Sequence, residues 1–156
     1  MSSPGARPSA THAQGQIVHA SCVAWNQRGL LITGTSGSGK STLALSLMGH
    51  GARLVADDRV NLRLEAGSVV ARAAPNLAGL IEARGIGLLW AEPLQSTRLI
   101  AVVDLDRVET ERLPPNREIH LLGRRLGLLY RVEGPHFAPA LMQFLKAGRR
   151  DPDHTG

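Results

Sequence analysis

Short apolar runs alternate with polar turns along most of this chain, and their lengths are typical of β-strands. Runs of Val, Ile, Leu and Ala are separated by Gly, Asn, Asp and Pro, which favour turns. The expected strands cover residues 17–25, 29–33, 53–58, 60–64, 68–72, 88–90, 99–105 and 126–132. The expected hairpins join 17–25 to 29–33 and 60–64 to 68–72.

Two other stretches carry the three- and four-residue spacing of apolar side chains that indicates a helix. The first covers residues 40–48 and ends at Gly49, since glycine is a usual helix terminator. The second covers residues 139–147, with Leu141, Phe144 and Leu145 on one face.

The remaining segments are predicted to be irregular or exposed. Residues 74–81 suggest a turn and a short helix, and residues 82–87 are interpreted as a charged turn because they mix an acid, a base and two glycines. Residues 106–117, with two consecutive prolines, are predicted to form an exposed loop. At the two ends we expect a disordered lead over 1–16 and a flexible tail over 149–156.

Composition fits one domain and argues against several classes of protein. Residues 17–148 of the 156 have the size of a single domain. The net charge of +5 comes almost wholly from arginine and suggests an acidic or phosphorylated ligand. The arginines are scattered and aromatic residues are few, so nucleic acid is not expected as a partner. A single cysteine, Cys22, rules out an internal disulfide and favours a cytoplasmic setting, and no apolar run is long enough to cross a membrane.

The strongest motif is G-T-S-G-S-G-K-S at residues 34–41, which matches the phosphate loop G-x-x-x-x-G-K-[ST]. In such a loop, main-chain N–H groups cradle nucleotide phosphates, and glycine permits backbone conformations that a Cβ would block. The predicted helix after it would point its N-terminus at the anion. The expected nucleotide-binding residues are Gly34, Thr35, Ser36, Gly37, Ser38, Gly39, Lys40 and Ser41, with Lys40 on the β- and γ-phosphates and Ser41 on Mg²⁺.

Asp57 and Asp58 end the apolar strand predicted at residues 53–58. A carboxylate in this position near a phosphate loop is typical of a Walker B-like acid, which holds Mg²⁺ directly or through water. Adjacent side chains on a strand point to opposite faces, so the two acids should have different roles unless the chain turns there. The alternative is a simple Asp-Asp turn before Arg59.

Three of these stretches together are similar to the HPr kinase/phosphorylase family, the serine kinases of the phosphotransferase-system carrier protein HPr. The matching runs are the phosphate loop at 34–41, G-A-R-L-V-A-D-D at 51–58 and A-P-N-L-A-G-L-I-E-A-R-G-I-G-L-L at 74–89. The last run is similar to the family's own signature, and the resemblance covers about residues 17–113. It implies an α/β fold of the phosphoenolpyruvate-carboxykinase-like class, a mixed sheet with flanking helices, in the family's short, catalytic-domain-only form.

The resemblance also implies roles for individual residues. Asp58 would take the proton from the target serine and return it in the reverse reaction, with the neighbouring Asp57 as the alternative base. Lys40 and His19 would contact phosphate groups. The residue pattern by itself favours a half-buried strand histidine at His19.

Ser41 and Glu82 would bind Mg²⁺ by the same resemblance, and Arg112, in the run E-R-L, would be a functional arginine. The family's Pro-Gly-Arg-Asn run, linked to dephosphorylation, is not found, and residues 129–135 stand near its expected place. The resemblance therefore supports kinase activity more directly than phosphorolysis.

The expected function is ATP- and Mg²⁺-dependent phosphorylation of HPr, within the regulation of carbon metabolism, with inorganic phosphate as the reagent of the reverse reaction. The family also assembles as homo-oligomers, an assembly open to this chain. Two alternatives are kept. A small-molecule kinase with the same loop would turn over ATP with a metabolite and not with HPr, and a nucleotide-sensing regulatory module would bind ATP even after Asp58→Asn.

Overall fold

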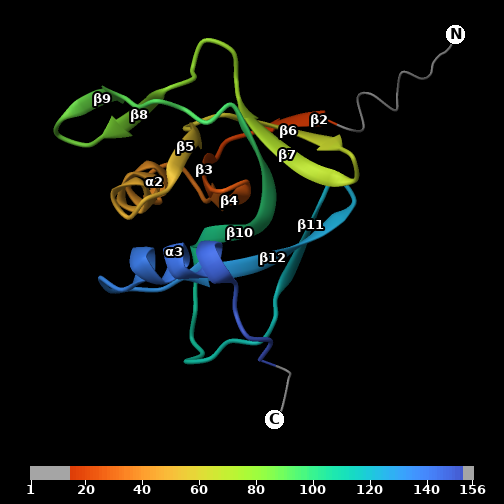
Figure 1. Cartoon of the computed structure of the whole chain (residues 1–156). Helices are drawn as coiled ribbons and strands as arrows, with labels where there is room; N and C mark the ends of the chain where they lie inside the picture. Colours follow the sequence, from red (N-terminus) through yellow and green to blue (C-terminus); the bar gives the residue numbers. More distant parts are fainter. Residues whose placement is uncertain (1–14, 153–156) are drawn as a thin grey trace, which may run out of the picture.

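The computed structural model describes residues 15–152, which form a mixed nine-stranded sheet, a separate two-stranded hairpin and two helices (Figure 1). The strands are β2 (Gly15–Val18), β3 (Ser21–Trp25), β4 (Arg28–Thr33), β5 (Arg53–Ala56), β6 (Val60–Glu65), β7 (Ser68–Ala73), β8 (Leu80–Ala83), β9 (Gly87–Trp90), β10 (Ser96–Val108), β11 (Glu118–Leu121) and β12 (Arg124–Arg131). The helices are α2 (Lys40–Gly49) and α3 (Phe137–Ala147).

The long strand β10 joins the two halves of the large sheet. Its first residues, Ser96 to Arg98, pair antiparallel with β7. From Leu99 onward it runs parallel to β4 and from Ala101 parallel to β12. The strand order is β2-β6-β7-β10-β4-β3-β5, with β12 beside β10 and β11 beside β12. Because β4 and β10 are parallel, their carboxyl ends meet at the same edge of the sheet.

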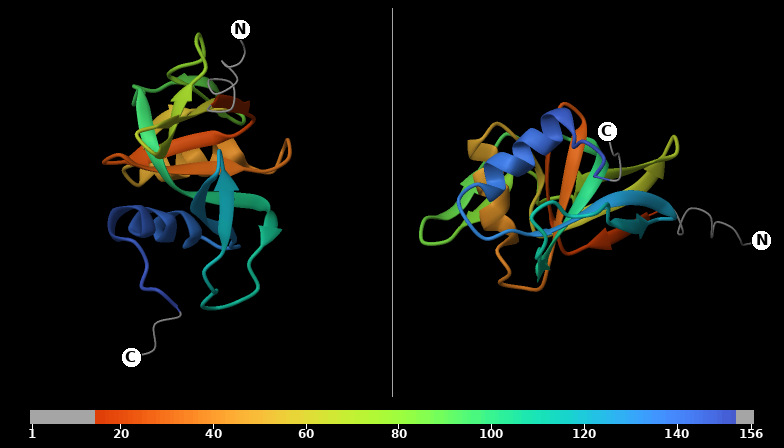
Figure 2. Two further views of the ribbon diagram at one scale, coloured as in Figure 1. Left: turned by 90° about the vertical axis from the view of Figure 1, so that its right-hand side faces the viewer. Right: turned by 90° about the horizontal axis from the view of Figure 1, so that it is seen from below.

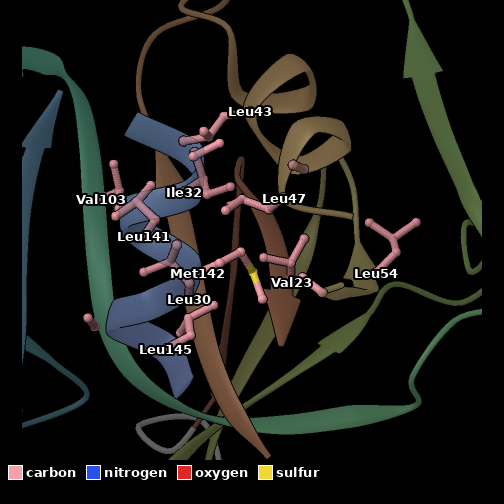
Figure 3. Close-up of a cluster of buried hydrophobic side chains, with 14 of the residues drawn as sticks. Val23, Leu30, Ile32, Leu43, Leu47, Leu54, Val103, Leu141, Met142 and Leu145 are labelled. Carbon is pink, nitrogen blue, oxygen red and sulfur yellow. The ribbon is translucent and has the colours of Figure 1, made fainter. Parts of the chain in front are cut away.

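The side chains of β4 are buried on both faces of the sheet. Leu30 and Ile32 belong to the core cluster that includes α2 and α3, whereas Leu31 belongs to the cluster on the opposite face, as the two-residue period of a strand requires. Figure 3 shows Leu47 of α2 and Leu141 of α3 in the first cluster, close to Ile32. The two helices also contact one another (Figure 2). This packing fixes the start of α2 relative to the end of β4.

Several predicted elements are confirmed. The strand before the phosphate loop, the helix after it and the hairpin at 60–72 are present as β4, α2 and β6–β7. The predicted antiparallel entry to the loop is also present as the hairpin β3–β4. Asn26 and Gln27 form its two-residue turn with φ angles of 47° and 62°, both positive as a type I′ hairpin turn requires.

The strand predicted at 17–25 is wrong as a single element. The chain bends at His19 and continues as two strands, because β2 pairs with β6 whereas β3 pairs with β4 and β5. Gly15 and Gln16, predicted to belong to the disordered lead, form the start of β2. The rest of that predicted lead, residues 1–14, lies outside the described residues.

The short helix predicted within 74–81 is also wrong. These residues form turns and then enter β8. Asn76 and Gly79 have φ angles of 73° and 80°, and left-handed residues interrupt a right-handed helix. Gly79 also accepts a hydrogen bond from the Ala91 N–H at 2.8 Å, and a Cβ at this glycine would lie 2.9 Å from the Ala91 carbonyl oxygen.

Other boundaries differ by a few residues. The turn predicted at 82–87 is confined to residues 84–86, since its ends belong to β8 and β9. Part of the loop predicted at 106–117 is the end of β10. β11 was not expected, because its turn to β12 is formed by Leu122 and Gly123 with φ angles of 49° and 79°, and Leu-Gly is not a typical hairpin signature.

The described part of the predicted tail contacts the loop after β10. Arg149 Nη2 donates to Asn116 Oδ1 at 2.6 Å, and Asn116 Nδ2 donates to Asp151 Oδ1 at 2.8 Å. Over residues 15–152, neither helix is long and apolar enough to span a membrane. The cytoplasmic setting stays a prediction.

Candidate active site

The phosphate loop lies between the end of β4 and the start of α2, as the sequence predicts. Its glycines have positive φ angles of 152° at Gly34, 83° at Gly37 and 102° at Gly39, a region that side chains rarely adopt. A Cβ on Gly34 would also lie 2.5 Å from Ser38 Oγ. Gly39 is the N-cap of α2, so the unpaired N–H groups of the first helical turn lie at the loop.

Lys40 and Asp106 both contact the first turn of the loop. Lys40 Nζ donates to the carbonyl oxygens of Gly34 at 2.9 Å and Thr35 at 3.1 Å. The Thr35 N–H donates to both carboxylate oxygens of Asp106 at 3.0 Å, and Thr35 Oγ1 donates to Oδ1 at 3.0 Å. The hydrogen bond from the Thr35 amide holds the pKa of Asp106 below its usual value, and the nearby Lys40 ammonium acts in the same direction.

Asp106 was missed by the sequence reasoning, which assigned it to an exposed loop. Its position follows from the parallel pairing of β10 with β4, in which Val103 lies beside Ile32 and Asp104 beside Thr33. Asp106 lies two residues after Asp104, and Thr35 lies two residues after Thr33. The Asp106 carboxylate therefore reaches Thr35. The signal in the sequence was the alternation V-V-D-L-D, which continues the strand.

Asp57 is buried behind the start of α2. β5 pairs with β3 so that Ala56 lies beside Cys22, which brings Asp57 opposite Ser21. Its Oδ1 accepts from Ser21 Oγ at 2.6 Å. Ser41 Oγ donates to the two oxygens at 2.8 and 2.9 Å, and the Glu82 N–H donates to Oδ2 at 3.3 Å. Asp57 therefore orients the hydroxyl of Ser41.

Asp58 is exposed, in contrast to its buried neighbour Asp57. Its φ of 73° turns the chain at the end of β5, so both neighbouring acids lie at the phosphate loop in different positions. Asp58 lines a cavity of about 140 Å³ in front of the loop, together with Lys40, Ser41, Glu82 and Arg84. The backbone therefore turns at the two aspartates, as the alternative of an Asp-Asp turn predicted. The same turn brings Asp58 to the cavity.

Glu82 and Arg84 reach this cavity from the β8–β9 hairpin. Arg84, which the sequence reasoning did not assign, also lines a second cavity of about 370 Å³ beside the loop. Leu43, Arg131 and Phe137 are among the other residues of that second cavity. The two cavities share Gly37, Gly39, Thr42 and Arg84, so they form neighbouring compartments around one loop.

His19 and Arg112 are not brought to these cavities. His19 lies in the bend between β2 and β3 and is exposed, so the interpretation as a half-buried strand histidine is wrong. The following residue, Ala20, donates its N–H to the Asp58 carbonyl oxygen at 3.3 Å. Arg112 is exposed in the loop after β10, and neither cavity includes it.

The oxygen donors at the smaller cavity fit a Mg²⁺ ion. Ser41, Asp58 and Glu82, whose side chains all carry oxygen atoms, line it, and Asp57 accepts the hydrogen bond of the Ser41 hydroxyl. Mg²⁺ prefers oxygen ligands and, in nucleotide sites, is held by one or two protein oxygens together with phosphate oxygens and water. The residues present therefore match this ion when a nucleotide supplies the remaining ligands.

Comparison with known proteins agrees with the fold and with the motifs. The family model for the HPr Serine kinase C-terminal domain matches residues 10–109. The chain is 39% identical over 102 residues to the HPr kinase/phosphorylase of Geobacillus sp., covering 61% of this chain and 32% of that protein. It is 38% identical over 114 residues to the enzyme of the same name from Lactiplantibacillus plantarum, covering 71% of this chain and 36% of the relative.

The solved structure of the Hpr(Ser) kinase/phosphatase from Coxiella burnetii superposes with a TM-score of 0.71 at 21% identity, over 84% of this chain and 88% of that one. This match confirms the predicted α/β fold with a mixed sheet and flanking helices. The chain spans about a third of the length of the two curated relatives described. Because the family model covers well over half of the sequence, the chain belongs to the family of the HPr serine kinase C-terminal domain.

Proposed function

We propose that this chain is an ATP-dependent protein-serine kinase that phosphorylates the carrier protein HPr. The observation that carries the proposal is the position of Asp58, an exposed residue that lines the same cavity as Lys40, Ser41 and Glu82. A phosphate-binding loop with a free carboxylate beside it has the two parts that transfer to a hydroxyl needs, since one holds the donor and the other receives the proton. The names of the curated relatives support HPr as the acceptor.

The phosphate loop would hold the triphosphate of ATP through its main-chain N–H groups. Lys40 would exchange its present carbonyl partners, Gly34 and Thr35, for phosphate oxygens. Ser41 and Glu82 would hold Mg²⁺, which neutralises phosphate charge when bound. Asp57 keeps the Ser41 hydroxyl oriented by accepting its hydrogen bond.

In the transfer step, the acceptor serine Oγ forms a bond to the γ-phosphorus while the bond from that phosphorus to the bridging oxygen of ADP breaks. The serine proton passes to the Asp58 carboxylate. Asp58, rather than the alternative Asp57, is proposed as the base because Asp57 is buried and already accepts hydrogen bonds from Ser21, Ser41 and Glu82. Protonated Asp58 could return the proton if inorganic phosphate attacked phosphoserine in the same cavity.

Purified HPr and its variant with the target serine replaced by alanine test the proposal, with radiolabelled γ-phosphate as the readout. We expect labelling of HPr alone, loss of labelling in Lys40→Ala, and loss of labelling with retained ATP binding in Asp58→Asn. Equal labelling of both HPr forms would refute the choice of acceptor. ATP turnover with a metabolite and none with HPr would instead indicate a small-molecule kinase.

Residues His19 and Arg112 stay predictions in this scheme, because they lie outside the two cavities of a single chain. Phosphorolysis and homo-oligomeric assembly stay predictions as well. Incubation of phosphorylated HPr with inorganic phosphate tests the first, and light scattering of the purified chain tests the second. His19→Ala and Arg112→Ala, assayed for transfer to HPr, show whether these side chains act in the assembled enzyme.

A further inference from the structure

The β8–β9 hairpin exposes large apolar side chains on one of its faces. Ile86 at the turn is 77% exposed, and Leu88 and Trp90 on β9 are 69% and 84% exposed. Leu88 pairs with Glu82 and Trp90 with Leu80, so these four strand residues share one face. We call Leu80, Ile86, Leu88 and Trp90 the hairpin surface.

The opposite face of the hairpin holds it to the rest of the molecule. Ile81 is 1% exposed and belongs to the core cluster with α2, against which Leu89 also packs. Figure 1 shows the hairpin projecting from the body beside α2 and separate from the large sheet. The exposed Leu88 and Trp90 are therefore not needed to hold the hairpin in place. Apolar side chains of this size gathered on one face are typical of an interaction site.

The hairpin surface adjoins residues of the same hairpin that line the phosphate cavity. Glu82 lies on the same face as Leu88 and lines that cavity, and Arg84 in the adjacent turn lines it as well. A serine hydroxyl has to come within hydrogen-bond distance of Asp58 to be activated. Because the serine side chain is short, the surface of a folded protein around that serine would have to come against the rim of the cavity, where the hairpin stands.

We infer that the hairpin surface is the docking site for the acceptor protein, and that the acceptor carries an apolar patch beside its phosphorylated serine. This inference rests on the proposed function and specifies its substrate class, since a small-molecule acceptor would leave Leu88 and Trp90 uncovered. Tryptophan at the centre of an interface is among the residues that contribute most to affinity. The continuity of the surface with the cavity through Glu82 favours an acceptor over a second copy of this chain.

The test compares Leu88→Ser/Trp90→Ser with Ile17→Ser, a control on β2 whose side chain is 67% exposed. Transfer to HPr is measured over a range of HPr concentrations, and the affinity for a fluorescent ATP analogue is measured separately. We expect the KM for HPr to rise at least about tenfold in the double variant, because two buried apolar contacts are lost. The kcat at saturating HPr, the affinity for the ATP analogue and the behaviour of Ile17→Ser should stay unchanged.

The outcomes separate the two proposals. If the unaltered chain labels HPr and the double variant keeps its KM, the docking inference is overturned and the proposed function stands. If the unaltered chain does not label HPr at all, both fall. If the unaltered chain is oligomeric and the double variant is monomeric with an unchanged KM, the hairpin surface is an interface between copies of this chain. That result would overturn the docking inference. Circular dichroism shows whether the double variant is folded. If it is not, the single variants Leu88→Ala and Trp90→Ala take its place, and an unchanged KM in both single variants would also overturn the docking inference.

Discussion

Replacing each of the two adjacent aspartates should affect stability very differently. Asp57→Ala removes the acceptor of the Ser21 hydroxyl, which is 0% exposed and has its hydrogen bond at 2.6 Å. Leaving one buried donor unpaired costs about 1–3 kcal/mol. The Ser41 hydroxyl is half-buried and can turn to water, and the Glu82 N–H contact of 3.3 Å is weak. The free energy of unfolding should therefore fall by about 2–3 kcal/mol.

Asp58→Gly is the matched control. The exposed carboxylate is lost, but glycine adopts the φ of 73° without strain. The relief of left-handed strain and the added entropy of the unfolded chain nearly cancel, so we expect a change between zero and about 1 kcal/mol. By the proposed function, this stable variant should lose phosphoryl transfer by a factor of about 10² to 10⁴.

Urea unfolding followed by circular dichroism measures both variants, and a double-mutant cycle identifies the contact. Ser21→Ala combined with Asp57→Ala removes donor and acceptor together, which is expected to be less costly than the sum of the single changes by about 1 kcal/mol or more. Equal losses in Asp57→Ala and Asp58→Gly would refute the buried-acceptor reasoning. So would a cycle that is additive within about 0.5 kcal/mol.

Substitutions at three further positions test other parts of the structure. Gly29→Ala should lower the free energy of unfolding by about 1–3 kcal/mol in a thermal or urea melt, because its Cβ would lie 2.6 Å from a main-chain oxygen of β10. Glu109 Oε2 lies 2.9 Å from Arg117 Nη2, and this hydrogen bond is the chief reason that the pKa of Glu109 is lowered below its ordinary value of 4.5. The stabilising effect is present above about pH 4.5 and is lost as the pH falls through the folded-state pKa, so Glu109→Gln should flatten the loss of stability below about pH 4.5 in unfolding curves. Asp106→Ala should weaken binding of an ATP analogue at least severalfold because Thr35 loses its acceptor, with Asp106→Asn intermediate and an unchanged affinity contradicting the role of this contact.

The centre of the site could be predicted from the sequence because its determinants are local. The phosphate loop is given by glycines that permit positive φ, and its flanking strand and helix by the spacing of residues such as Leu31 and Leu47. The two acids at the end of β5 were found in the same way. Which of them is buried could not be predicted, because that depends on the pairing of β5 with β3 and on the left-handed turn at Asp58.

Contacts between distant segments account for the errors. Residues 74–81 have helix-like spacing, but the close approach of Gly79 to Ala91 makes them a turn and a strand. Asp106 reaches Thr35 only because two strands far apart in sequence are parallel neighbours. Arg84 enters the cavity because a hairpin, and not a simple turn, carries it there.

The place of β10 in the sheet determines when, during synthesis of the chain, the phosphate loop can begin to bind a nucleotide tightly. The hairpins β3–β4 and β6–β7 can form as soon as their own residues leave the ribosome, since each joins neighbouring stretches of chain. The strand between β7 and β4 arrives only with residues 96–108, and with it the carboxylate that holds Thr35. A nascent chain that stops before Ser96 thus carries the whole nucleotide motif without its neighbouring strand, and tight nucleotide binding is expected only after β10 has joined the sheet.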